Sequence, residues 1–286
     1  MKNKLFYIIL VVVFVAGLSL LLYPVISNAY NSWLQSRAIA EYSQQVNQME
    51  QEVYEQEMAK ANAHNQALLE RVDPYTLPEE MLPQYNELLS VTSQKIMAYV
   101  EIPSLDVSLP IAHGTSEEVL KDKIGHLEWT SLPVGGENTH AVISGHRGLP
   151  SSELFTNIDH LELGDKFYIH VLGDTLEYQV CNISVVGPED QRLLRVEEGQ
   201  DLVTLVTCTP YGINSHRLLV RGIRTGTSGD ELPVNVRVKN EITAVDVLML
   251  VALILVGVAV VAFVILLLGG KKKKKKGEQK NEKKDA

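Results

Sequence analysis

The chain has 286 residues, a net charge of −9 and two cysteines. Of its 26 basic and 35 acidic residues, 11 basic and 3 acidic ones lie at the two ends, which leaves 15 basic and 32 acidic residues in 24–270. So acidic a middle excludes nucleic-acid binding, which needs basic patches. No P-loop, GxGxxG motif or zinc-ligand spacing occurs, so the sequence implies neither a cofactor nor a metal.

Two uncharged apolar runs, 5–23 and 247–268, lie near the chain ends. At about 1.5 Å per residue the second is long enough to cross a bilayer. Lysines flank both runs on the side of the chain ends, which predicts that both termini are cytoplasmic and the middle is extracellular. A cleaved signal peptide ending in SNA at 27–29 is the alternative for the first run, but its length favours a retained anchor in membrane lipid.

Apolar residues recur every three or four positions over 29–70, which predicts one amphipathic helix. Its apolar stripe either packs on its own domain or rises from the membrane as a stalk. Three prolines in 71–83 end the helix, and this stretch contains Asp73-Pro74-Tyr75. A simple linker is one interpretation of 71–83.

Short apolar runs separated by turn residues follow, a pattern typical of a closed β-barrel. Strands are expected at 97–105, 107–114, 140–145, 166–172, 175–187, 201–208 and 216–223, in a set of about eight. A short helix capped by Ser116 is expected at 116–123, and Gly173-Asp174 predicts a hairpin turn.

The chemistry gathers around Cys208, which ends the apolar run 202–207. The turn sequence TPYGINS follows, and Arg217 begins the next strand. A thiol and a cation are therefore expected side by side next to the turn of one hairpin. Such a cation can stabilise a thiolate or a developing oxyanion. By position alone, a lone cysteine at a strand end is more often a small buried residue than a catalytic one. Cys181 lies in a strand-like run and is expected in the core, which leaves Cys208 unpaired.

A reactive thiol needs a partner that moves protons, and histidine is the usual choice. His146 follows the apolar run HAVIS, and the flanking Gly145 and Gly148 allow the sharp turn that would present the imidazole at a strand end. His126 and His140 are the rivals, and we expect both to be hydrogen-bonded within the fold.

The motifs TLVTC, SGHRGLP and NSHRLLVRG, at this spacing, resemble the sortase family of Gram-positive surface transpeptidases. The longer strings HLEWTSLPVGGENTHAVISGHRGLPSSELFTNID and CTPYGINSHRLLVRG resemble its class C branch, the pilin-polymerising sortases. The resemblance covers roughly residues 65–225. Trp129 departs from it, since a small residue is expected there, and we expect the change to alter a loop without touching a catalytic position.

The resemblance implies a mainly β fold, a closed eight-stranded sortase barrel with short helices, an N-terminal helical segment, a lid and two transmembrane helices. The expected parts are 1–27 (cytoplasmic flank and first span), 28–72 (helical segment), 73–93 (lid and linker), 94–225 (catalytic barrel), 226–245 (linker), 246–269 (second span) and 270–286 (Lys-rich tail). In this arrangement Asp73-Pro74-Tyr75 forms the lid, with Asp73 paired to Arg217 and Tyr75 covering Cys208.

The activity that the resemblance implies is cleavage of an LPXTG-like sorting signal between Thr and Gly. Cys208 attacks the Thr carbonyl, His146 shuttles the proton, and Arg217 holds the oxyanion or the substrate backbone. The implied partners are pilin subunits that carry the signal and an acceptor Lys, with a cell-wall precursor as a further possibility. The alternatives are a housekeeping sortase that anchors proteins to peptidoglycan, a hydrolytic cell-wall cysteine peptidase, and a non-catalytic adhesion module.

Overall fold

The computed structural model describes residues 2–92, 94–227 and 256–257, and the chain divides into two compact units, Met1–Pro24 with Asn240–Ala286, and Val25–Lys239. The helices are α1 (Lys2–Asn47), α2 (Gln51–Leu69), α3 (Leu82–Tyr85) and α4 (Glu117–Leu120), with 3-10 turns η1 (Pro103–Leu105), η2 (Ile158–His160) and η3 (Arg192–Leu194). The strands are β1 (Ile96–Ile102), β2 (Val107–His113), β3 (Ile124–His126), β4 (Thr139–Ser144), β5 (Lys166–Val171), β6 (Asp174–Val186), β7 (Asp201–Thr209) and β8 (His216–Thr227).

The eight strands close into a barrel in the order β1-β2-β3-β4-β7-β8-β6-β5, which confirms the predicted architecture. Two neighbouring pairs, β2 with β3 and β4 with β7, are parallel, and the other pairs are antiparallel. The sequence pattern missed β3, because three residues are too few to show an alternation. This short strand joins β2 to β4 and so completes the closure.

The barrel interior is filled by the inward-facing residues of all the longer strands, as the two-residue period of a strand requires. Phe167 of β5 and Tyr178 of β6 stack inside it at 5.7 Å between ring centroids. On β4, β7 and β8 the alternation leaves a second apolar row on the outer face, formed by Val142, Val206 and Leu219. This outer row supports the candidate site.

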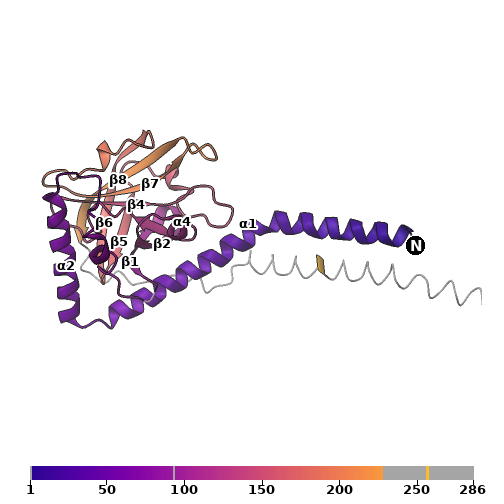
Figure 1. The fold of residues 1–286 in the computed structure, drawn as a ribbon, viewed down its shortest axis with the longest axis horizontal. Helices are drawn as coiled ribbons and strands as arrows, with labels where there is room; N and C mark the ends of the chain where they lie inside the picture. The colour runs from indigo at the N-terminus through magenta and orange to yellow at the C-terminus, as the bar shows by residue number, and fades with distance from the viewer. Residues whose placement is uncertain (1, 93, 228–255, 258–286) are drawn as a thin grey trace, which may run out of the picture. The chain divides into compact units, whose positions relative to one another are not determined.

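The predicted helix over 29–70 is two helices, because the chain breaks at residues 48–50 between α1 and α2 (Figure 1). Within the second unit, the apolar stripe of α1 packs against β1, with Tyr42 buried beside Tyr99. The Tyr42 hydroxyl donates to Met97 O at 3.0 Å and accepts from Leu172 N at 2.9 Å. Of the two interpretations of this stripe, the structure supports packing on the chain's own domain.

Among the described residues, one helix is long and apolar enough to cross a membrane, over Val12–Asn47 near the N-terminus. The second expected span, 246–269, lies outside the described residues except for 256 and 257, and the tail 270–286 lies outside them entirely. The two-span topology therefore stays a prediction.

Cys181 is exposed, so its predicted place in the core is wrong. The register of β6 against β8 shifts between Val180 and Asn182, and this bulge turns the thiol outward. Its Sγ lies 3.5 Å from Arg221 O, and the partial desolvation of the sulfur by the neighbouring strand raises the pKa of the Cys181 thiol. Both cysteines are free, as the sequence suggested.

Candidate active site

Cys208 lies near the end of β7, where the chain turns into β8. Val203 and Leu205 belong to the barrel core, so the alternation of the strand points Val206 and Cys208 to the outer face. Cys208 is directly paired with Arg217 of β8. The thiol and the guanidinium therefore start from neighbouring positions on one face, as the hairpin in the sequence predicted.

His146 reaches the same place from the other side of β7. The parallel pairing of β4 with β7 continues past the end of β4, because Gly145 N donates to Val206 O at 3.0 Å. His146 directly follows Gly145, and it therefore lies at the end of β7 that carries Cys208. No hydrogen bond joins imidazole and thiol among the residues that the structure describes, which is common before substrate is bound.

The two glycines that flank His146 have different reasons to be glycine. Gly148 has φ +77°, a left-handed conformation, and a Cβ there would lie 3.0 Å from the Tyr211 ring. Gly145 has no such φ, but a Cβ would lie 2.7 Å from the Phe155 ring. A side chain at either position would displace the loop that carries His146.

The Arg217 guanidinium is held by its own hairpin. Its Nη1 donates to Asn214 O at 3.3 Å and to His216 O at 3.1 Å. Neither the guanidinium nor the thiol of Cys208 is in the interior of the barrel, and both are only partly exposed. The arrangement places a fixed cation one strand away from a thiol, where it can stabilise negative charge.

The Asp73-Pro74-Tyr75 segment packs on this outer face. The Tyr75 ring meets Trp129 edge-on at 5.6 Å between centroids and joins the apolar row that contains Val206. Arg195 lies over the other part of the ring at 4.7 Å, and its Nε donates to the Tyr75 hydroxyl. Because Val206 is two residues before Cys208, the segment lies on the face that carries the thiol.

Asp73 does not pair with Arg217 among the described residues, so that expectation is wrong. Its carboxylate accepts from Tyr75 N at 2.9 Å and from Thr76 Oγ1 at 3.1 Å. The short side chain of an aspartate is well suited to such a local turn, which competes with the longer-range ion pair. Asp73 thus shapes the segment, and Tyr75 makes the contacts that hold it.

Arg71 ties the same segment to the barrel. Its Nη2 donates to Trp129 O at 2.8 Å and its Nη1 donates to Thr76 O at 2.5 Å. The expectation that Trp129 alters only a loop is too narrow, since this residue contacts the Tyr75 ring and accepts from Arg71. The sequence pattern indicated neither Arg71 nor Arg195, and the one available signal was the unexpected large ring at 129.

The rival histidines are hydrogen-bonded within the fold, as expected. His126 binds Tyr85 Oη at 3.0 Å and Ser131 O at 2.8 Å, and burial lowers its pKa to about 3. His140 binds Arg195 O and Thr204 Oγ1, each at 2.7 Å, and burial lowers its pKa to about 4. Both rings are neutral at pH 7, and His140 helps to hold Arg195 in place.

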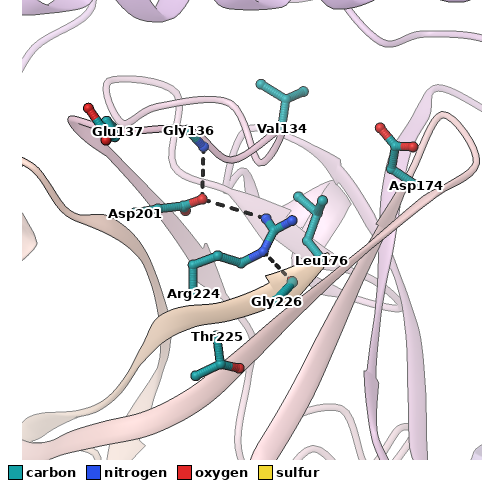
Figure 2. Close-up of a pocket in the computed structure, with 9 residues that line it drawn as sticks. All are labelled: Val134, Gly136, Glu137, Asp174, Leu176, Asp201, Arg224, Thr225 and Gly226. Carbon is teal, nitrogen blue, oxygen red and sulfur yellow. Dashed lines mark hydrogen bonds and ion pairs between the residues drawn. The ribbon is translucent and has the colours of Figure 1, made fainter. Parts of the chain in front are cut away.

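A shallow pocket of about 580 Å³ opens at the opposite end of the barrel (Figure 2). Asp201, at the start of β7, accepts from Gly136 N at 2.8 Å and pairs with Arg224 at 3.5 Å. At about 3.3 Å per residue, Asp201 is roughly 23 Å along the strand from Cys208. The pocket is therefore separate from the candidate active site, and Gly136, Asp201 and Arg224 in its lining bind one another.

Known proteins match this arrangement. Residues 100–225 match the family described as Sortase domain. Sortase A of Bacillus anthracis is 26% identical over 226 residues, which cover 79% of this chain and 97% of that protein.

The solved structure of sortase C1 from Streptococcus agalactiae is 44% identical, with a TM-score of 0.64, over 66% of this chain and 98% of that one. Sortase C of Streptococcus pneumoniae is also 44% identical, with a TM-score of 0.61, over 68% of this chain and 100% of that one. The chain therefore belongs to the sortase family of cysteine transpeptidases, and its neighbours among solved structures are class C sortases.

Proposed function

We propose that this chain is a membrane-anchored, pilin-polymerising sortase. It cleaves an LPXTG-like sorting signal between Thr and Gly and joins the Thr to a Lys amine of a pilin subunit. The observation that supports the proposal is the pairing of Cys208 with Arg217 on the outer face of β7 and β8, with His146 just past the adjoining end of β4 and the 73–75 segment packed on that face. In this proposal residues 94–225 are the catalytic barrel, and Asp73, Pro74 and Tyr75 form the lid of 73–93.

The reaction proceeds in two acyl transfers. The Cys208 sulfur attacks the Thr carbonyl carbon, the Thr–Gly C–N bond breaks, and His146 gives a proton to the leaving Gly amine. The thioester is then attacked by a Lys amine, which loses a proton to His146 as the C–S bond breaks. Arg217 donates hydrogen bonds to the oxyanion that forms in each step. No metal or cofactor takes part.

Three further features favour a pilin acceptor over peptidoglycan. The Streptococcus pneumoniae neighbour is a sortase C with pilin substrates, and this chain is similar to it over nearly all of that structure. The middle of the chain has 15 basic and 32 acidic residues, a surface that attracts a partner offering lysines. The lid also limits access to Cys208, as suits an enzyme that is opened by a large protein substrate.

The test is an analysis of products from a pilin with an LPXTG-like signal, incubated with the full-length enzyme in detergent. The proposal predicts a ladder of pilin multimers joined through Thr–Lys isopeptide bonds, identified by mass spectrometry of the linked peptides. A pilin whose lysines are methylated serves as the control and should give no ladder. Free Thr carboxylate as the main product with unmodified pilin would instead indicate a hydrolytic peptidase.

A further inference from the structure

We propose that Arg147 is a positioning residue, which fastens the loop that carries His146 to the hairpin that carries Cys208. The inference rests on the proposed function, because it concerns the geometry of those two residues. Arg147 directly follows His146 in the chain, and its side chain is only 9% exposed. A charged side chain is rarely buried to this extent on a surface loop without partners that hold it.

The Arg147 guanidinium has partners on both sides of the site. Its Nη2 pairs with Asp159 of η2, on the same side as the loop of His146. Its Nη1 makes a long contact of 3.5 Å with Thr209 Oγ1, the residue after Cys208. Its Cζ lies 5.8 Å from the ring centroid of Tyr211, in the turn beyond. One guanidinium therefore bridges the two segments that carry the imidazole and the thiol.

The backbone beside Arg147 supports this bridge. Gly148 lies so close under Tyr211 that a Cβ would be 3.0 Å from the ring, so the two segments are in direct contact. Gly148 N also donates to Thr156 Oγ1 at 3.1 Å, which fixes the outer part of the loop. His146 is thus held by the β4–β7 ladder on one side and by the Arg147 contacts on the other.

Stability alone does not account for this placement. The Arg147 Nε is buried and has no hydrogen-bond partner among the described residues. A buried N–H without a partner costs free energy, and such groups in native structures call for an explanation. The guanidinium is therefore held where it connects two segments rather than where all of its donors are satisfied. Small errors in the placement of a catalytic group lower the turnover rate strongly. The function of the bridge is therefore to keep His146 in place relative to Cys208.

The chain contains a matched control at the far end of the barrel. Arg224 also pairs with a carboxylate, Asp201, and also lies against an aromatic ring, that of Tyr178 at 5.5 Å. Figure 2 shows the pair of Arg224 with Asp201, and Arg224 also donates to Gly226 O at 2.6 Å. Its surroundings resemble those of Arg147, but it is roughly 23 Å along β7 from the thiol. Arg224→Met therefore separates loss of a buried arginine from loss of positioning.

The experiment compares Arg147→Met, Arg147→Lys and Arg224→Met in the full-length chain, with Cys181→Ala as the common background so that Cys208 is the only thiol. Four quantities are measured: kcat and KM for cleavage of an LPXTG peptide, the pH dependence of Cys208 alkylation, and the melting temperature. His146→Ala and Cys208→Ala give the reference values for a lost imidazole and a lost thiol.

We expect Arg147→Met to lower kcat on the order of a hundredfold while KM stays within about twofold, because a misplaced group slows the chemical steps more than binding. The pH dependence of alkylation should move toward that of His146→Ala, since the thiol would no longer sense the imidazole. Arg147→Lys should recover part of kcat, because it keeps the charge beside Asp159 but loses the planar guanidinium. Arg224→Met should change the melting temperature alone.

A kcat and an alkylation profile equal to those of the parent in Arg147→Met would overturn the inference. Equal losses in Arg147→Met and Arg224→Met would also overturn it, since the effect would then be general destabilisation. Should Arg147→Met fail to fold, Tyr211→Leu decides, because this ring is 60% exposed and its removal leaves the core intact. The inference then requires a lower kcat and the same shift in profile, and an unchanged enzyme refutes it. Full activity in His146→Ala or Cys208→Ala would show that the proposed site itself is wrong.

Discussion

Replacement of Tyr75 by alanine should open the lid and expose Cys208. The ring makes three contacts that hold the segment: the edge of Trp129, the guanidinium of Arg195, and a hydrogen bond from that guanidinium to its hydroxyl. Tyr75→Ala removes all three at once. Tyr75→Phe removes only the hydrogen bond and keeps the ring.

The size of the effect follows from these contacts. An edge-on aromatic pair contributes about 0.5–1.5 kcal/mol. A cation over an exposed ring contributes about 0.5–1 kcal/mol, and a hydrogen bond about 0.5–1.5 kcal/mol. Tyr75 is partly exposed, which favours the low ends of these ranges, so about 1.5 kcal/mol is lost in all. Since 1.4 kcal/mol is a factor of ten, Tyr75→Ala should raise the open fraction about tenfold, and Tyr75→Phe about twofold.

The assay is the rate of Cys208 alkylation by iodoacetamide, measured as the mass increase of the intact Cys181→Ala protein. Tyr54→Phe is the matched control, because Tyr54 lies on α2, away from the lid. The substitution removes a hydroxyl that donates to Asp174 Oδ2 at 2.7 Å. Its rate should equal that of the parent. A Tyr75→Ala rate within twofold of the parent would refute the lid, and residues 71–83 would then be a Pro-rich linker.

Four further outcomes are expected. Arg217→Lys should lower turnover on the order of 10²-fold, because Lys keeps the charge but loses the planar donors, and near-normal rates would reduce Arg217 to a structural role. Cys181→Ala should leave both turnover and melting temperature nearly unchanged, since this thiol is exposed. Acidification should destabilise the fold, because burial lowers the pKa of His140 to about 4 and that of His126 to about 3. Below pH 6.5 the unfolded chain therefore binds protons that the folded chain excludes. The free energy of unfolding should fall by about 2 kcal/mol between pH 6.5 and 5.5. His140→Asn should reduce that pH dependence by about 1 kcal/mol over the same interval in thermal melts, since burial also lowers the pKa values of His64 and His113, which remain, and an equal slope would contradict the assignment. Protease added to protoplasts should spare an epitope placed after Ala286, and its digestion would overturn the predicted orientation.

The closed barrel and the meeting of Cys208 with Arg217 could be predicted because both depend on short-range patterns. Alternating apolar runs indicate strands, and a turn sequence between two strands fixes which residues face each other. The prediction for His146 also used a strand end, since the parallel neighbours β4 and β7 end on the same side of the sheet. Local sequence contains this information, and the structure agrees with it.

The incorrect predictions have a common physical cause, which is competition between partners that are near and partners that are distant in the sequence. Tyr75 N and Thr76 Oγ1, which bind the Asp73 carboxylate, are two and three residues away in the chain, whereas Arg217 is 144 residues away. Cys181 faces outward because a bulge shifts the register, and nothing in the alternation of its own strand indicates a bulge. The role of Trp129 depends on Tyr75, 54 residues earlier in the chain.

The central claim is that Cys208 is the nucleophile that accepts the sorting signal. The most direct measurement is the mass of the full-length enzyme after brief incubation with an LPXTG peptide and acid quenching, followed by mapping of the modified residue. If Cys208 is the nucleophile, the enzyme gains a mass equal to the peptide up to its Thr, located on Cys208, and loses this mass on addition of an amine acceptor. An adduct on Cys181, or the same adduct formed by Cys208→Ala, would contradict it.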